Sequence, residues 1–305
     1  MSNASTSTTS PTLVLVKFLL LATLWGSSFF FIAIALNTLT WGQIAWSRVI
    51  AGGIFMIVLL LLTREKLPKD AGTWGHIAFA GVIGIGIPFT FFPWAQQYIA
   101  SATATIYNGL TPIMTAIVSV YLLRVEKFNR NQLIGVVVGL FGLVIIIGPW
   151  TITEFGGSFW AQIAALSAAI MYAFSGTWLK KYVFPRGVSS RAISIIEVGA
   201  AALFMLALTP LLTPGDFTID WTTIVAISII GFGGTGLAYI WFNDVLNSWG
   251  PTRASAVTYI MPLVGVFLGV VFLSETLHWN EPVGGLIVIM GVLIMRRKDK
   301  TPALA

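Results

Sequence analysis

Long apolar segments recur along the whole chain and are separated by short polar connections. About 20 helical residues cross the ~30 Å hydrocarbon core of a bilayer, and a helix satisfies its backbone hydrogen bonds internally, as lipid requires. The alternating segments of about 10 residues that are typical of membrane β-strands do not occur. We therefore predict an all-α membrane protein. Its ten transmembrane helices are expected at residues 13–36, 43–62, 75–97, 102–123, 131–149, 159–179, 191–212, 221–246, 253–273 and 282–295.

The composition leaves no room for a soluble domain. Of the 305 residues, 57% are hydrophobic and 9% charged, whereas a soluble domain carries about 25% charged residues. The chain has no cysteine, which excludes disulfides and thiolate chemistry. Residues 1–12 are rich in Ser and Thr and predict a disordered tail. Ala33-Ile34-Ala35 imitates a signal-peptidase site, but the surrounding segment is long enough to remain as a membrane span.

The net charge of +6 is distributed in a way that predicts topology. In a ten-helix arrangement the basic residues fall on one side, together with both termini, and Arg48 is the exception. Acidic residues such as Asp216, Asp220 and Glu275 fall on the other side. Because cytoplasmic loops carry the excess of Lys and Arg, we expect a protein of the cell inner (plasma) membrane with both termini in the cytoplasm.

The two halves of the chain repeat each other at an offset of about 149 residues, which predicts two units of five helices each. The units are expected at residues 13–150 and 151–296, followed by a cytoplasmic tail at 297–305. Five is an odd number, so the second unit enters the membrane from the opposite side, as in the inverted repeats of secondary transporters. The matching pairs are Phe55 and Phe204, Gly84 and Gly231, Gly86 and Gly233, Pro112 and Pro262, Glu126 and Glu275, Asn131 and Asn280, Gly135 and Gly284, and Gly142 and Gly291.

On these features the chain resembles the EamA-type carriers of the drug/metabolite transporter superfamily. The resemblance rests on the opening Ala22-Thr-Leu-Trp25-Gly26-Ser27, on Arg48 in the second helix, on the proline-containing helices, and on the Glu-led turns before the closing helix of each half. Size and aromatic content are most similar to the bacterial amino-acid exporter branch, which includes aromatic amino-acid exporters. The resemblance implies a central cavity surrounded by helices one, three, four, six, eight and nine.

Glycines and prolines interrupt corresponding helices of the two halves. Interrupted helices at matching positions are the best sequence indication of a transport site, although small residues also allow close helix packing. The candidate hinge residues are Gly86, Pro88, Pro112, Gly233, Gly236 and Pro262.

Polar and aromatic side chains within these helices predict a neutral, hydrogen-bonding cavity. Buried amides and hydroxyls are costly when unpaired, so they should face a cavity or one another. Such a cavity suits a zwitterionic or amphipathic solute, whereas a phosphate carrier needs several inward basic residues. The alternative interpretation is that single members anchor helices at the membrane surface or join them. The candidate substrate-binding residues are Trp25, Trp94, Gln97, Tyr107, Asn108, Tyr172, Ser175, Tyr239, Asn243 and Tyr259.

Arg48 and Glu197 are the charges deepest in the predicted spans and occupy the same repeat position. Inversion separates their Cα atoms by roughly 13 Å in depth, so we expect two separate sites. Arg48 either binds a substrate carboxylate or extends its side chain to the membrane surface. Glu197 either couples transport to protons or pairs with a nearby basic residue.

Export of amino acids or related small amphipathic metabolites by alternating access is the predicted function. Carriers of drugs, nucleotide-sugars or lipid-linked metabolites, and a non-transporting membrane scaffold, are the alternatives. We expect no enzyme, because no histidine within a span could activate Ser175. We also expect no cofactor and no metal, because His76 and His278 stand alone at membrane edges. The expected partners are a small amino-acid-like substrate and membrane lipid, without nucleic acid, and the sequence is compatible with a monomer or an oligomer.

Overall fold

The computed structural model describes residues 11–125, 130–147, 157–249, 254–255 and 257–295, and this part of the chain is almost entirely helical. Among these residues, three segments form π-helical turns, η1, η2 and η5, and η4 is a single 3-10 turn. The elements are α1 (Pro11–Ala35), α2 (Trp41–Thr63), α3 (Ala71–Gly81), η1 (Val82–Gly86), α4 (Pro88–Ala95), α5 (Ser101–Asn108), α6 (Thr111–Ile117), η2 (Val118–Leu122), α7 (Arg130–Ile147), α8 (Gly157–Tyr182), η4 (Phe184–Arg186), α9 (Ser190–Ala207), α10 (Thr209–Leu212), α11 (Trp221–Ser228), η5 (Ile229–Leu237), α12 (Ala238–Trp249), α14 (Val257–Leu273) and α15 (Asn280–Met295).

Seven continuous helical stretches among the described residues are long and apolar enough to cross a membrane. They correspond to predicted spans one to four and six to eight, and the shorter helices α7, α14 and α15 coincide with the other three. The protein is therefore all-helical with multiple candidate spans, while a count of ten crossings stays a prediction. Large apolar side chains on the outside, such as Leu62 (79% exposed) and Leu203 (69%), are consistent with contact with lipid.

Corresponding spans of the two halves are interrupted in the same way. In the third span η1 separates α3 from α4, and in the eighth span η5 separates α11 from α12. Gly86 ends η1 and Pro88 begins α4, while Gly233 and Gly236 lie within η5. Glycine and proline favour such turns because glycine allows close backbone approach and proline lacks a backbone donor. The predicted interruptions are thus present in the structure.

The two proline-containing helices differ. Pro112 lies at the start of α6, after a break at Gly109 and Leu110 that separates α5 from α6. Its counterpart Pro262 lies inside the continuous helix α14. The matching prolines therefore produce a break in the first repeat and none in the second.

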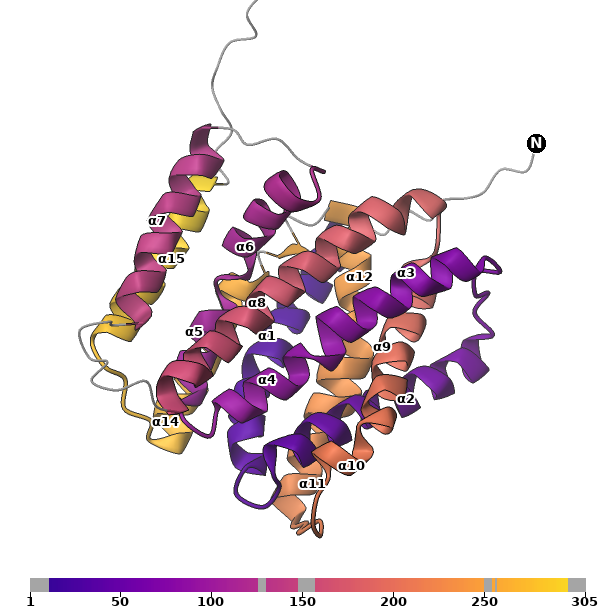
Figure 1. The fold of residues 1–305 in the computed structure, drawn as a ribbon, viewed down its shortest axis with the longest axis horizontal. Coiled ribbons are helices and arrows are strands. Elements are labelled where there is room, and N and C mark those ends of the chain that lie inside the picture. The colour runs from indigo at the N-terminus through magenta and orange to yellow at the C-terminus, as the bar shows by residue number, and fades with distance from the viewer. Residues whose placement is uncertain (1–10, 126–129, 148–156, 250–253, 256, 296–305) are drawn as a thin grey trace, which may run out of the picture.

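Glycines bring the two repeats into close and reciprocal contact. A Cβ at Gly86 would lie 2.8 Å from the Phe204 ring, and a Cβ at Gly236 would lie 2.7 Å from the Phe55 ring. Phe55 and Phe204 are a matching pair, so these two contacts are related by the repeat. The last helices of the repeats, α7 and α15, lie side by side at one edge of the molecule (Figure 1).

Polar residues fix the two ends of the helix bundle. Asp70 and Asp220, 150 residues apart, accept backbone hydrogen bonds at the starts of α3 and α11. At one end, which we call the basic end, Arg186 pairs with Asp70 at 2.8 Å and Arg191 pairs with Glu65 at 3.0 Å. At the opposite end, which we call the acidic end, the Glu275 carboxylate accepts from the first two backbone N–H groups of α5, at 2.8 and 3.0 Å.

Candidate functional site

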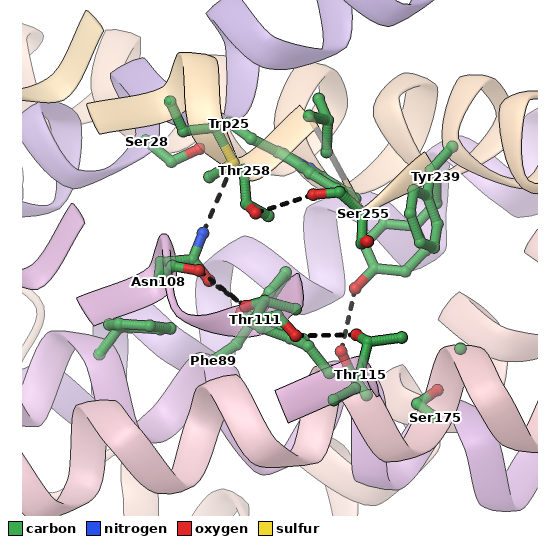
Figure 2. A pocket seen from close by; sticks show the side chains of 18 of the residues that line it. Trp25, Ser28, Phe89, Asn108, Thr111, Thr115, Ser175, Tyr239, Ser255 and Thr258 are labelled. Carbon is green, nitrogen blue, oxygen red and sulfur yellow. Dashed lines mark hydrogen bonds between the residues drawn. The ribbon is translucent and has the colours of Figure 1, made fainter. Parts of the chain in front are cut away.

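A cavity is lined by residues of both repeats (Figure 2). Its volume is about 80 Å³, counted as the space open to the centre of a water molecule. One water needs about 10–15 Å³ on this measure. The cavity is thus large enough for several waters or a small solute. Its lining consists of Trp25, Ser28, Phe29, Ile32, Arg48, Gly84, Phe89, Phe92, Asn108, Thr111, Thr115, Tyr172, Ala173, Ser175, Gly176, Glu197, Tyr239, Phe242, Leu246, Ser255, Val257, Thr258 and Met261.

Aromatic rings form much of the cavity wall. Trp25 of α1 lies edge-on to Tyr239, with ring centres 5.6 Å apart, and Phe92 stacks on Tyr172 at 6.1 Å. Phe89 contacts both tyrosines, at 6.4 Å from Tyr172 and 6.3 Å from Tyr239. These rings come from four helices, α1 and α4 of the first repeat and α8 and α12 of the second, so the wall belongs to neither repeat alone.

Hydroxyl and amide groups also line the cavity. Figure 2 shows Asn108, Thr111 and Thr115 following one another, with Thr258 and Ser255 nearby. The Thr111 hydroxyl donates to the Asn108 carbonyl at 2.7 Å, and the Thr115 hydroxyl donates to the Thr111 carbonyl at 2.8 Å. A hydroxyl that donates to its own helix retains lone pairs with which it accepts hydrogen bonds from a ligand.

Two of the aromatic side chains hold the interrupted helices in place across the repeat interface. The Trp25 indole N–H donates to the Gly234 carbonyl in η5 at 2.8 Å, and the Tyr239 hydroxyl donates to the Gly84 carbonyl in η1 at 3.0 Å. Each bond runs from a residue of one repeat to a π-helical turn of the other. In a π-helical turn the backbone hydrogen bonds join residues five positions apart instead of four, which changes the donors available to the local carbonyls. Here the carbonyls of Gly234 and Gly84 accept hydrogen bonds from cavity side chains.

Arg48 projects from α2 into the cavity and is only 5% exposed. Its Nε donates to the Thr235 hydroxyl at 3.0 Å, and its Nη2 lies 3.5 Å from the Ser28 hydroxyl. Its Cζ lies 3.8 Å from the centre of the Phe89 ring, close enough for a cation–π contact. Within the described part of the chain no carboxylate pairs with this guanidinium. The structure thus contradicts the interpretation that Arg48 extends to the membrane surface.

Glu197 projects from α9 into the same cavity and is 2% exposed. One of its carboxylate oxygens accepts from the Asn243 amide at 2.9 Å, and the same amide nitrogen donates to the Ser194 hydroxyl at 2.9 Å. No basic residue in the described ranges forms an ion pair with Glu197. The pairing with a nearby basic residue that the sequence left open is therefore absent from these ranges.

The expectation of two separate sites for Arg48 and Glu197 is only partly met. The two side chains do not contact each other, as the difference in depth predicted. Both side chains nevertheless line one cavity. The cavity reaches the second helix of each repeat, α2 and α9.

Of the candidate substrate-binding residues, Trp25, Asn108, Tyr172, Ser175 and Tyr239 line the cavity. The others lie elsewhere because their helices turn them toward neighbouring helices or the surface. Trp94 packs on Tyr98, Gln97 is exposed at the acidic end, Tyr107 donates to Gln162 at 2.7 Å, and Asn243 is fully buried behind Glu197. The side chain of Tyr259 lies outside the described part of the structure.

The sequence interpretation missed the phenylalanines of the cavity wall, above all Phe89 and Phe92. The chain has 21 phenylalanines, most of which pack in the core or face the exterior, so residue type alone gave no signal. A usable signal was their position. Phe89 and Phe92 are three residues apart, on one face of the short helix α4, which begins at Pro88 and contains Pro93.

A sequence profile of the EamA-like transporter family matches the chain twice, at residues 12–148 and 159–297. The chain belongs to this family. It is similar to an uncharacterized transporter of Archaeoglobus fulgidus, with 27% identity over 92% of this chain and 97% of that protein. It is also similar to the uncharacterized inner membrane transporter YedA of Escherichia coli K12, with 25% identity over 92% of this chain and 90% of YedA.

The fold is similar to that of a solved crystal structure as well. The TM-score is 0.68 at 18% identity, and the match covers 94% of this chain and 97% of the other. Together these findings make the protein a multi-pass membrane transporter of the EamA-like family. The cavity between the repeats of this EamA-like transporter is its candidate substrate site.

Proposed function

We propose that the protein is a secondary transporter that exports amino acids or related small amphipathic metabolites by alternating access. The observation that carries this proposal is the central cavity, in which an aromatic wall lies beside one buried guanidinium and one buried carboxylate. A solute with apolar and charged parts can satisfy such a lining, because each part finds a group of matching chemistry.

The number of cations in the cavity argues against phosphorylated cargo. Arg48 is the one basic residue among the described residues of the lining. Nucleotide-sugars and other phosphate-bearing solutes carry more negative charge than one guanidinium offsets. A zwitterion brings no net charge, so it suits a lining that contains one charge of each sign.

Alternating access is supported by the way in which the repeats meet. Each interrupted helix contacts the opposite repeat through a glycine and through one hydrogen bond from a cavity side chain. Inverted repeats that meet at a midplane site open alternately when one bundle rocks against the other. We propose the π-helical turns η1 and η5 as the hinges of this motion.

For the orientation, we propose that the basic end faces the cytoplasm and that the protein lies in the inner membrane. Lys and Arg at the start of α1 and in the connections after α2, η2 and α8 support this orientation. Export then runs from the basic end toward the acidic end. The proposed partners are the small solute and membrane lipid.

Counterflow of labelled neutral amino acids into proteoliposomes tests the substrate proposal. We expect wild-type protein to exchange at least one of the twenty amino acids, and both Asn108→Ala and Tyr239→Ala to lower the exchange at equal expression. Folded wild-type protein that exchanges none of them would overturn the substrate proposal. Both variants matching wild type would overturn the assignment of the site.

The absence of native cysteine makes the access mechanism directly testable. Single cysteines at Thr115 and Thr258 should react with a membrane-impermeant thiol reagent from either side of the membrane, and substrate should slow both reactions. A scaffold without a gated cavity would leave both positions unreactive, or reactive from one side only.

A further inference from the structure

We infer that Arg48 binds the carboxylate of the transported solute and thereby selects carboxylate-bearing substrates. The inference rests on the proposed function and deepens it, because it assigns one end of the substrate to one side chain. It also implies that Arg48 is a ligand-binding residue and not a structural one.

The guanidinium is fixed in one orientation on three of its sides. The Thr235 hydroxyl accepts from Nε at 3.0 Å, the Ser28 hydroxyl lies 3.5 Å from Nη2, and the Phe89 ring covers one face at 3.8 Å. A guanidinium has five N–H donors. Within the described chain these contacts leave the Nη1 donors without a protein acceptor, so a planar group of donors remains beside the cavity.

Space next to the guanidinium is kept open by a glycine. A Cβ at Gly234 would lie 3.5 Å from Arg48 Nη2 and 3.1 Å from the Ser28 oxygen. Any side chain at this position would extend toward the donors. The carbonyl of Gly234 accepts from the Trp25 indole, whereas the described donors of Arg48 point to Thr235 and Ser28.

The charge of Arg48 lacks the partner that a structural arginine needs. A buried cation carries a large desolvation penalty, which a nearby anion and further hydrogen bonds normally offset. In the described ranges Arg48 has two neutral hydroxyls and an aromatic face, while the Glu197 carboxylate is bound to Asn243 instead. A ligand carboxylate supplies the missing anion and accepts two parallel N–H bonds in the geometry that arginine favours.

The residues around Arg48 also indicate which chemical group adjoins the carboxylate of the solute. Phe89, whose ring contacts the guanidinium, also contacts Tyr172 and Tyr239, and Tyr172 stacks on Phe92. A solute held by Arg48 therefore places its adjoining carbon skeleton against aromatic rings. This arrangement fits an α-amino acid with an apolar or aromatic side chain.

The test compares three ligands that differ in one charged group each: L-phenylalanine, 3-phenylpropionate without the amine, and 2-phenylethylamine without the carboxylate. Their inhibition of labelled phenylalanine binding to the purified full-length protein is measured for wild type, Arg48→Gln and Arg48→Lys. Arg64→Gln is the matched control, since Arg64 ends the same helix but is exposed and outside the cavity. Unfolding temperatures of all four proteins without ligand are measured in parallel.

We expect Arg48→Gln to weaken phenylalanine and phenylpropionate by about 10- to 100-fold, as the loss of a charge-assisted hydrogen bond predicts. Phenylethylamine should bind equally to both proteins, because it never contacted the guanidinium. Arg48→Lys should retain part of the carboxylate affinity, and Arg64→Gln should retain all of it. Without ligand, Arg48→Gln should unfold at the wild-type temperature or above, because it removes an unpaired charge.

Equal weakening of all three ligands by Arg48→Gln, or no weakening of phenylalanine, would overturn the inference and leave the proposed function intact. A lower unfolding temperature of unliganded Arg48→Gln would also overturn it, since Arg48 would then be structural. Folded wild-type protein that binds none of the three ligands would overturn the inference, while the proposed function is decided separately by the exchange of the twenty amino acids.

Discussion

Arg48 and Glu197 stand at the same position of the two repeats, 149 residues apart, yet their surroundings differ. Arg48 lies against two hydroxyls and a phenylalanine ring, whereas Glu197 accepts from an asparagine that is itself held by Ser194. One charge is therefore free to meet a ligand, and the other is already part of a protein hydrogen-bond network. Matching positions of the two repeats thus carry side chains with different surroundings.

The helices that carry Arg48 and Glu197, α2 and α9, each pack closely against a glycine of the other repeat. A glycine of the third span, Gly81, packs against the backbone of Glu197, and a glycine of the eighth span, Gly231, packs against the backbone of Arg48. The contacts differ in closeness. A Cβ at Gly81 would lie 2.2 Å from the Glu197 carbonyl oxygen, and a Cβ at Gly231 would lie 3.2 Å from the Arg48 oxygen and 2.5 Å from the Ala51 methyl group.

Enlarging these glycines should give the largest effect. We expect Gly81→Leu to lower the free energy of unfolding by at least about 3 kcal/mol, because only movement of the α9 backbone could make room. Gly231→Leu should cost less, about 1–3 kcal/mol, because the nearest atom, the Cβ of Ala51, would lie 2.5 Å away instead of 2.2 Å. Thermal unfolding in detergent measures both.

Gly75 provides the control on the same helix as Gly81. Nothing lies within 4 Å of a Cβ at Gly75, so Gly75→Leu should not lower stability and should raise it by up to about 1 kcal/mol, because leucine favours a helix more than glycine does. A loss of stability at Gly75 as large as that at Gly81 would show that leucine disturbs α3 itself. The loss at Gly81 could then not be assigned to its contact with the Glu197 backbone.

Replacing the two charged residues should change the free energy of unfolding less than enlarging the glycines does. Glu197→Leu should lower the free energy of unfolding by about 1–3 kcal/mol, because the Asn243 amide loses an acceptor in a buried place. Glu197→Gln retains an acceptor oxygen and should recover most of this loss. Arg48→Met should leave stability unchanged or raise it, since apolar replacement of a buried charge that lacks an ionic partner is often stabilising.

The same unfolding measurement decides this comparison. A greater loss of stability for Arg48→Met than for Glu197→Leu would contradict this prediction. It would mean that the charge of Arg48, not that of Glu197, stabilises the fold.

Much of this architecture could be predicted from the sequence, because lipid imposes a simple rule on hydrophobic length. The predicted segments overlap the described helices, and the predicted interruptions at Gly86, Pro88, Gly233 and Gly236 coincide with η1 and η5, whereas Pro262 interrupts no helix. The inward direction of Arg48 could not be predicted, since it depends on how α2 is rotated against its neighbours. Asn243 and Tyr107 lie outside the cavity lining for the same reason: a mid-helix polar side chain can face another helix as readily as a cavity.

Removing one hydroxyl from the cavity wall should have a moderate effect. Tyr239→Phe leaves the Gly84 carbonyl in η1 without its donor and should cost about 1 kcal/mol of unfolding free energy. Tyr172→Phe is the matched control, because the hydroxyl of Tyr172 forms no hydrogen bond within the described chain, and its loss should cost less than about 0.5 kcal/mol. Equal costs would contradict the claim that Tyr239 holds the interrupted helix.

The smallest difference is expected between Asp70 and Asp220, which cap matching helices at opposite ends of the bundle. Hydrogen bonds from Thr73 lower the pKa of Asp70, and hydrogen bonds from Thr223 lower the pKa of Asp220. A carboxyl whose pKa is lower in the folded state stabilises the fold above its unfolded pKa of about 3.9, and this contribution disappears as pH falls through the folded pKa. Asp70→Ala and Asp220→Ala should therefore lower the unfolding temperature at pH 7 and approach wild type in strong acid.

Salt should distinguish the two variants, because Asp70 also pairs with Arg186 at 2.8 Å on an exposed surface. Salt screens exposed ion pairs but has little effect on a neutral donor at a helix cap. The effect of Asp70→Ala at pH 7 should thus shrink between low and high salt, while that of Asp220→Ala should stay constant. Identical salt responses would mean that the two caps contribute in the same way, and that the asymmetry between the repeats is confined to the cavity.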